Sequence, residues 1–484
     1  MREGSLSGQA KPDEAQRPDW RDGKRYLWLL GTVVPLFLFA GWGMVNLTGL
    51  GLFWWMGPLW LYVFIPALDI AFGADPTNPP DTVVAWLEQD RYYRWVTYAF
   101  LPLQFVALFV GLWLITYHGG LNVVDKVGIA VTLGSMNGVA INTAHELGHK
   151  KEHLERWFAR VALAPTGYGH FFIEHNRGHH VRVATPDDPA SSRLGESFWA
   201  FLPRTVLGSV RNSWRLERIR LRRMGKHTFS LRNDVLNAWA MTVVLWGVLL
   251  ALFGLGILPY LLIQAVFGFA LLEAVNYIEH YGLKREQLPN GRWERVNPRH
   301  SWNNNNITTN LFLYHLQRHS DHHANPTRRY QALRHFEQSP QLPGGYATMI
   351  VLAYFPPLWR HVMDKRVLAH YDGDVRLANI QPAKHDTILA RYGKPSQTGG
   401  VRRSATGLAE TPGPRVGAPP SAAAMSTYRC EVCDYAYDDA NGEPRDGFPA
   451  ATPWTEVPDE RFCPNCGVRD KVDCVALDDH TAPE

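Results

Sequence analysis

Histidines in four short clusters are the residues of this sequence whose type and spacing could support metal chemistry. Most neighbours within a cluster are three or four positions apart, which places side chains on one face of an α-helix. A cluster can therefore direct two or more imidazoles toward one point. The nine positions are His145, His149, His175, His179, His180, His280, His319, His322 and His323.

The number of these imidazoles indicates two metal ions. Six ligands fill one octahedral ion, and imidazole suits zinc, copper, iron and nickel alike. The competing interpretation is that each histidine is solvated or hydrogen-bonded near a helix end. It explains a single histidine well, but it does not explain four clusters with helical spacing at one membrane face. Histidines outside the pattern are expected to be structural or to orient the ligands: His153, His170, His300 and His315.

One cluster also matches a protease signature. His145, Glu146 and His149 form the HExxH pattern of zinc metalloproteases, in which the glutamate acts as the base. Such a site needs only one further ligand. It would leave the other seven histidines and the cysteines without a role, so a membrane zinc metalloprotease is the alternative from another enzyme class.

The cysteines indicate a second, separate metal site near the C-terminus. Four of the five form two CxxC pairs, Cys430 with Cys433 and Cys463 with Cys466. Four thiolates can hold one metal ion tetrahedrally, and a zinc ribbon would satisfy the same spacing. The remaining thiol, Cys474, is expected to be a small apolar core residue.

Six apolar stretches must position the histidines. Each is long enough to cross about 30 Å of hydrocarbon, which takes about 20 residues of helix. Aromatic residues make up 12% of the chain and charged residues only 19%, below the usual quarter, as in membrane proteins. The sequence therefore predicts an all-α domain of six transmembrane helices, near 26–48, 51–72, 95–117, 126–144, 235–255 and 257–279.

The distribution of basic residues predicts the orientation of these helices. The short loops near 49, 120 and 256 contain almost no Lys or Arg, whereas the connection over 145–234 contains the basic run Arg215 to Lys226. The positive-inside bias places that connection, both termini and every histidine cluster on the cytoplasmic side of a bacterial-type inner membrane. The polar N-terminus has no secretory signal, so the first apolar stretch is expected to remain as an anchor.

Composition divides the chain into four parts. We predict a cytoplasmic segment over 1–25, the membrane domain over 26–394, a Gly-, Pro- and Ser-rich linker over 395–425 and a tail domain over 426–484. The tail carries 14 acidic and 5 basic residues, a net charge of −9, which leaves +13 for the rest of the chain. A flexible linker of this length spans roughly 30 Å, so the acidic tail can dock on the basic body.

The histidine motifs resemble those of a known family. The segments HELGHK, EHNRGHHVRVATPDDPA, NYIEHYG and LQRHSDHHANPTR are similar to the histidine boxes of the membrane-bound alkane 1-monooxygenases, within the fatty-acid desaturase and hydroxylase superfamily. The resemblance covers most of 20–390. It implies six transmembrane helices with a cytoplasmic helical cap, two irons held by the nine histidines, and insertion of one oxygen atom from O2 at the terminal carbon of an alkane. It also implies a role for Asn276 behind the ligands or through a water.

The tail resembles a rubredoxin, a small β-rich domain that holds one iron and transfers single electrons. The resemblance rests on the four cysteines of the CxxC pairs and on the surrounding residues Tyr428, Tyr435, Tyr437, Gly447, Trp454 and Gly467. Two positions depart from the pattern: Asp434 stands where glycine is common, and Cys474 where an aromatic residue is common.

Together the two resemblances predict terminal hydroxylation of linear alkanes, with electrons delivered by the attached rubredoxin. A separate NAD(P)H-dependent rubredoxin reductase would supply that domain, because the chain has no nucleotide-binding fingerprint. A fatty-acid desaturase or another hydrocarbon hydroxylase would use the same metal chemistry and remains an alternative, as does a redox protein without a substrate. The lipid bilayer is an expected partner, and nucleic acid is not.

An alkane offers no polar group, so its binding must come from burial of apolar surface. We expect a tunnel between the transmembrane helices. Its candidate lining residues are Phe53, Trp54, Leu61, Leu133, Leu271 and Leu272.

Overall fold

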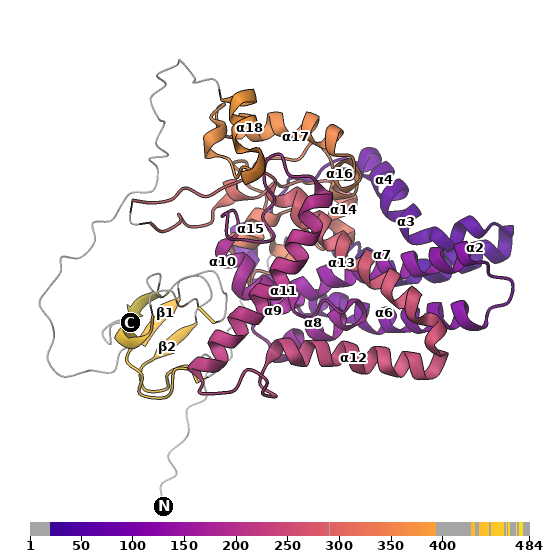
Figure 1. Ribbon diagram of the computed structural model, residues 1–484, viewed down its shortest axis with the longest axis horizontal. Helices are drawn as coiled ribbons and strands as arrows, with labels where there is room; N and C mark the ends of the chain where they lie inside the picture. The colour runs from indigo at the N-terminus through magenta and orange to yellow at the C-terminus, as the bar shows by residue number, and fades with distance from the viewer. Residues whose placement is uncertain are drawn as a thin grey trace, which may run out of the picture.

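The computed structural model describes residues 20–289, 291–393, 427–430, 435–444, 447–458, 461, 463–464, 471 and 474–477. The predicted linker over 395–425, most of the predicted segment over 1–25, Cys433 and Cys466 lie outside the described residues. Within the described residues, a large helical part is followed by a small β-sheet (Figure 1).

Five helical segments are long and apolar enough to cross a membrane. Two of them join shorter pieces: Gly51–Phe72 combines a 3-10 turn (Gly51–Trp55), α3 (Met56–Leu59), a π-helical turn (Trp60–Phe64) and α4 (Ile65–Phe72), and Leu255–His280 combines a 3-10 turn with α13 (Leu258–His280). The others are α6 (Arg91–Tyr117), α7 (Val123–Gly148) and α12 (Asp234–Phe253). These five segments agree with five of the six predicted stretches.

The first predicted stretch is broken into pieces. It contains α1 (Leu29–Thr32), a 3-10 turn (Val34–Leu36) and α2 (Phe37–Thr48). Pro35 lies in the 3-10 turn, and proline removes a backbone donor that a continuous helix would use. The apolar helix Val34–Thr48 is shorter than the five candidate spans. The structure therefore supports five spans, and the sixth stays a prediction.

Glycines bring α7 and α13 into close contact. A Cβ on Gly138 would lie 2.7 Å from Cδ2 of Leu271, and one on Gly134 would lie 2.9 Å from the carbonyl oxygen of Gln264. Small residues allow helix backbones to approach in this way. The last turns of these two helices carry His145 and His280, so the packing fixes the distance between two of the predicted ligand positions.

Further helices surround the histidine-bearing ends of α7 and α13. Figure 1 shows α6, α7 and α12 on the right of the molecule, with α16, α17 and α18 above them and α10 and α15 to the left. In chain order they are α5 (Asp81–Gln89), α8 (His153–Leu163), α9 (Phe171–Glu174), α10 (His180–Arg182), α11 (Phe198–Arg223), α14 (Ile307–Phe312), α15 (His319–Ala324), α16 (Tyr346–Ala353), α17 (Pro356–His370) and α18 (His385–Tyr392).

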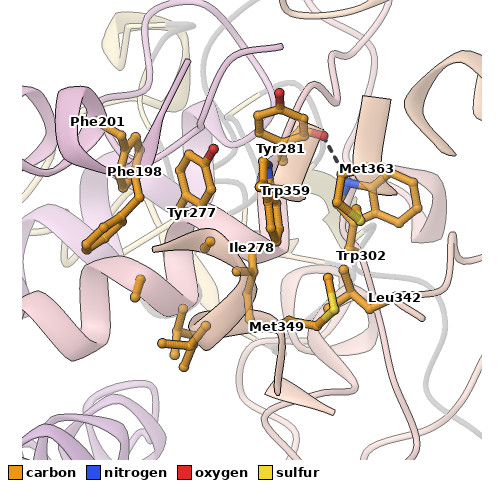
Figure 2. Packing of buried hydrophobic residues seen from close by; sticks show 14 of the residues in the cluster. Phe198, Phe201, Tyr277, Ile278, Tyr281, Trp302, Leu342, Met349, Trp359 and Met363 are labelled. Atoms are coloured by element: carbon orange, nitrogen blue, oxygen red, sulfur yellow. Dashed lines mark hydrogen bonds between the residues drawn. The ribbon is translucent and has the colours of Figure 1, made fainter. Parts of the chain in front are cut away.

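An aromatic core fixes the C-terminal end of α13. Figure 2 shows Tyr277 and Tyr281 packed against Trp359, with Trp302 near Tyr281 and with Phe198 and Phe201 of α11 on the side of Tyr277. The Tyr281 hydroxyl donates to Asp364 Oδ1 at 2.9 Å, and Trp302 Nε1 donates to the Tyr281 carbonyl at 2.9 Å. These contacts tie α13 to α11 and α17 directly beside His280.

The tail forms a three-stranded antiparallel sheet in the order β2-β1-β3. Its strands are β1 (Thr427–Cys430), β2 (Ala436–Asp438) and β3 (Cys474–Leu477). A small core lies against it, in which the rings of Tyr428 and Trp454 stack with centroids 4.7 Å apart. The predicted β-rich tail domain is confirmed in this respect.

Candidate metal centre

The structure gathers the nine predicted histidines into two buried groups. In each group, one ligand atom per residue lies within 4.8 Å of all the others. The five-histidine group contains His145, His149, His175, His180 and His322. The four-histidine group contains His179, His280, His319 and His323. The ligand atoms come from α7, α13, α15 and the chain around α10, so distant parts of the sequence build each group.

A π-helical turn divides its histidines between the two groups. The turn covers His175–His179 and runs directly into α10, which begins at His180. His179 and His180 are adjacent in sequence, yet their rings belong to different groups. Asp188 Oδ2 lies 2.9 Å from Nδ1 of His179 and accepts a hydrogen bond from Ser191 Oγ at 2.6 Å. This contact directs Nε2 of His179 toward the four-histidine group.

The ring nitrogens converge in a way that fits metal ions. His180 Nε2 lies 3.0 Å from His175 Nε2 and 3.1 Å from His322 Nε2. A proton can link one such pair, but it cannot link every member of a group at once. In addition, Nε2 of His145, His149 and His179 has no hydrogen-bond partner. Buried polar atoms without partners are costly, so converging lone pairs fit two nitrogen-ligated cations.

Burial also keeps these imidazoles in the form that binds metals. Desolvation, followed by the repulsion of neighbouring imidazoles, holds the pKa of six of them well below the usual value of 6.5. They are His149, His175, His180, His319, His322 and His323. A neutral imidazole offers its lone pair without first releasing a proton, so the groups are ready to bind metal at neutral pH.

Glu146 of the HExxH motif is held by an ion pair and a backbone hydrogen bond. Its Oε1 forms a buried ion pair with Lys150 Nζ at 2.9 Å and accepts the backbone N–H of Tyr330 at 3.2 Å. Lys150 Nζ also donates to the carbonyl of Arg328 at 2.8 Å. The carboxylate thus joins α7 to the chain that follows α15. It is engaged as a packing contact, which argues against its use as the base of a protease.

Asn276 lies in a polar network beside the histidine groups. Its Nδ2 donates to Glu273 Oε2 at 3.1 Å, and Glu273 also accepts from Tyr168 and Thr205 at 2.8 and 2.9 Å. Asn276 and Glu273 line a small cavity together with His175 and His179. The role predicted for Asn276, behind the ligands or through a water, stays a prediction, and Glu273 is a member of this network that was not predicted from the sequence.

An apolar cavity begins close to the histidine groups. Its walls include Asn142 and Leu316, each three residues before a ligand position, and Tyr346. Of the predicted lining residues, Leu61, Leu133, Leu271 and Leu272 are present. Phe53 and Trp54 do not line it. Trp54 is instead buried in a hydrophobic cluster with residues of α6 and α12.

Aromatic rings that the sequence did not single out surround the cavity. The Phe37 and Trp60 ring centroids are 4.4 Å apart, and those of Trp60 and Phe312 are 5.0 Å apart. All three line the cavity. Phe312 lies in the short helix α14, which no apolar run of the sequence marked as part of a substrate site.

Two of the four predicted tail ligands fall within the described residues. Cys430 and Cys463 are both buried and belong to one cluster with Tyr435 and Cys474. Cys474 pairs with Cys430 across β1 and β3 and is half-buried, in keeping with a packing role. Cys433 and Cys466 lie outside the described residues.

Comparison with known proteins agrees with both parts of the chain. Residues 126–376 match the family described as Fatty acid desaturase, and residues 427–473 match Rubredoxin. The Alkane 1-monooxygenase of Acinetobacter baylyi is 47% identical over 375 residues, which cover 77% of this chain and 92% of that protein. Alkane 1-monooxygenase 1 of Alcanivorax borkumensis is 47% identical over 380 residues, covering 78% and 94%. The Alkane 1-monooxygenase of Ectopseudomonas oleovorans is 46% identical over 379 residues, with the same coverage.

Proposed function

The chain belongs to the alkane 1-monooxygenase family, and on that basis we propose that it converts linear alkanes into 1-alkanols with O2. The observation that carries this function is the position of the two histidine groups next to a cavity with apolar walls. The attached rubredoxin supplies the electrons. One oxygen atom enters the terminal C–H bond, and the other leaves as water after the uptake of two electrons and two protons.

We assign two irons to the histidine groups. His145, His149, His175, His180 and His322 would hold one, and His179, His280, His319 and His323 the other. When bound, the irons supply the activation of O2. The protein buries all nine imidazoles, and Asp188 orients His179. Asn276 and Glu273 hold a polar cavity behind His175 and His179, a suitable place for a water.

The cavity binds and orients the alkane. Each buried CH2 group contributes about 0.8 kcal/mol, so a long chain binds without any polar contact. Asn142 and Tyr346 are two of the few polar residues in a mostly apolar wall, and both lie near the histidine groups. The terminal carbon is therefore directed toward the metal end, while the Phe37, Trp60 and Phe312 rings limit the space farther away.

The rubredoxin domain delivers electrons from the end of α11. The guanidinium of Arg223, the last residue of α11, lies 5.8 Å from the centre of the Phe448 ring. Gly447 packs so closely that an added Cβ would lie 2.7 Å from the backbone nitrogen of Met224. The net charges of −9 on the tail and +13 on the rest favour this approach over longer distances.

Three further features belong to the same proposal. A separate NAD(P)H-dependent rubredoxin reductase refills the four-cysteine iron site of Cys430, Cys433, Cys463 and Cys466. The apolar helix Val34–Thr48 joins the five longer segments as a sixth span. The positive-inside bias then places both termini, the helical cap and the metal centre on the cytoplasmic side of the membrane.

Product analysis tests the function directly. The iron-loaded protein in lipid discs receives reductase, NADH, a mixture of linear alkanes and ¹⁸O2, and the products are identified by mass spectrometry. A 1-alkanol with one ¹⁸O atom is the expected product, and an anaerobic sample is the control. An alkene without label would replace hydroxylation by desaturation. Electron flow without any organic product would reduce the chain to a redox relay.

A further inference from the structure

The two histidine groups differ in the number of imidazoles, and a carboxylate stands where the smaller group lacks one. Glu279 Oε2 lies 3.2 Å from His319 Nε2. His319 belongs to the four-histidine group, and Glu279 directly precedes its member His280 at the end of α13. We propose that Glu279 is the fifth ligand of the four-histidine group, which gives each iron five protein ligands. This inference rests on the proposed pair of irons.

The distances around His319 support a ligand position. Metal bonds to nitrogen and oxygen are about 2.1 Å long, so two ligand atoms at right angles are about 3.0 Å apart. His319 Nε2 lies 2.9 Å from His323 Nε2 and 3.3 Å from His280 Nε2. The separation of 3.2 Å to Glu279 falls between these two values. The carboxylate oxygen therefore has the same spacing as the neighbouring imidazole ligands.

The surroundings of Glu279 leave its charge without another partner. The residue is 1% exposed, and its Oε1 has no hydrogen-bond partner. Among the described residues, no Lys or Arg forms an ion pair with it; its recorded partner is His319. The Tyr346 phenol is near enough to interact, but it forms no hydrogen bond of normal geometry. Buried charges are normally paired or bound to metals, so the environment calls for a cation.

Other buried carboxylates around the centre differ in this respect. Glu146 pairs with Lys150, Glu174 pairs with Arg182, and Glu273 accepts three hydrogen bonds from Tyr168, Thr205 and Asn276. Each of them has at least one cation or hydrogen-bond donor from the protein. Glu279 is the carboxylate that points at a ligand nitrogen of the group, whereas Asp188 contacts the opposite nitrogen of His179.

An anionic ligand on one iron makes the pair asymmetric. Imidazole is a neutral ligand, so nine imidazoles alone would leave the positive charge of two buried irons uncompensated. A carboxylate lowers that charge at the four-histidine group and stabilises the more oxidised state there. Glu279 is also close to Tyr346, which lines the apolar cavity. The asymmetry would therefore lie on the side of the centre that faces the substrate.

Mössbauer spectroscopy of the full-length protein loaded with ⁵⁷Fe tests the assignment. Glu279→Gln keeps the shape but removes the charge, so one of the two histidine-site signals should change its quadrupole splitting while the other stays unchanged. The rubredoxin iron is an internal standard that should not shift. Glu155→Gln is the control, because Glu155 of α8 is also fully buried but pairs with Arg329 and belongs to neither histidine group; it should leave both histidine-site signals as in the unaltered protein.

A second variant separates a ligand from a packing residue. Glu279→Ala should lose about one iron per chain, and added formate, which fits the vacated volume and supplies a carboxylate, should restore that iron and its signal. The inference would be overturned if both variants kept their full iron content and both histidine-site signals were unchanged. It would also be overturned if Glu279→Gln changed the signals of both irons equally. Fewer than two histidine-bound irons in the unaltered protein would instead overturn the proposed pair of irons.

Discussion

The histidine centre and the cysteine-containing tail are both proposed metal sites, but their residues come from different distances along the chain. The histidines come from α7, α13, α15 and the segment around α10, and all nine are buried by helix packing. Cys430 ends strand β1 of a small three-stranded sheet, and Cys463 packs against it in a core of a few residues. The packing of the helices therefore positions the histidines, whereas we expect a metal bound by the cysteines to stabilise the fold of the small tail.

This difference separates the effects of losing each metal. A domain of fewer than about 60 residues buries little apolar surface, so a bound metal contributes much of its folding free energy. The large helical part has extensive hydrophobic cores of its own, so we expect its fold to depend less on bound metal. Damage to the histidine centre should therefore abolish chemistry and preserve the fold, while damage to the cysteine site should disturb the tail and preserve the chemistry.

The largest effect is expected from removal of a histidine at the contact between several rings. His180→Ala deletes the imidazole whose Nε2 lies 3.0 Å from His175 and 3.1 Å from His322. We expect at least a roughly 100-fold loss of alkane hydroxylation, together with loss of histidine-bound iron. Iron analysis and product formation measure the two quantities. His170→Phe is the control, because His170 is buried and packs on Tyr168 outside both groups. Full activity of His180→Ala would contradict the ligand assignment.

Removal of a tail cysteine should give a loss that can be reversed. Cys463→Ser should lower NADH-driven turnover by roughly 10- to 100-fold, because electrons no longer reach the histidine centre from its own tail. The histidine-bound iron should remain. Added free rubredoxin should restore turnover in Cys463→Ser but not in His180→Ala. If free rubredoxin fails to restore turnover in Cys463→Ser, loss of the tail site also damages the histidine centre, and the two sites are not independent.

The same contrast explains what could be predicted from the sequence. Ligand spacing within one helical turn is a local property, so the four histidine clusters and the two CxxC pairs were visible in the chain. The division into groups of five and four was not, because His179 and His180 are adjacent and only the π-helical turn separates their directions. Glu279 was hidden for a related reason: its role depends on His319, which α15 brings to it from another part of the chain.

The cavity was predicted only where its walls come from long apolar helices. Leu133 and Leu271 were correctly predicted to line the cavity, because α7 and α13 pack against each other. Phe37 and Phe312 were missed because they lie in α2 and α14, which are placed by tertiary contacts. The break at Pro35 was not predicted, because the apolar residues on both sides of this proline continue the pattern of a membrane-spanning helix.

Acid should weaken the histidine part in a way that follows from its burial. Six ligand histidines have a pKa well below 6.5 in the folded chain, so below about pH 6.5 the unfolded chain binds protons that the folded chain does not. Stability of the metal-free protein should therefore fall as pH falls, by up to about 1.4 kcal/mol per pH unit for each histidine.

Thermal unfolding of the metal-free protein in detergent measures this effect. The midpoint at pH 5.5 should be clearly below that at pH 7.5, while midpoints at pH 7.5 and 8.5 should agree, because these imidazoles are neutral in both states there. A midpoint that does not change between pH 7.5 and 5.5 would mean that protons enter the folded centre, and that the nine rings are less enclosed than their contacts indicate.

The smallest effect is expected where the two parts of the molecule touch. Arg223→Ala removes the cation over Phe448, and cation–π contacts at exposed sites contribute about 0.5–1 kcal/mol. Turnover driven by the tail should fall roughly two- to fivefold, and more at low salt than at high salt, because charges at an exposed contact mainly affect the rate of approach. Arg215→Ala on the same helix is the charge-matched control.

The helix α11 contacts both the tail and the histidine centre. Glu217 of α11 accepts from Arg177 at 3.2 Å, and Arg177 lies in the π-helical turn between the ligand histidines His175 and His179. The helix that receives the tail is thus joined to the turn that serves both histidine groups. If Arg223→Ala and Arg215→Ala slow turnover equally, the tail is held by net charge alone. A loss confined to Arg223→Ala would mean that the tail docks at one defined place on α11, the helix that contacts the π-helical turn His175–His179.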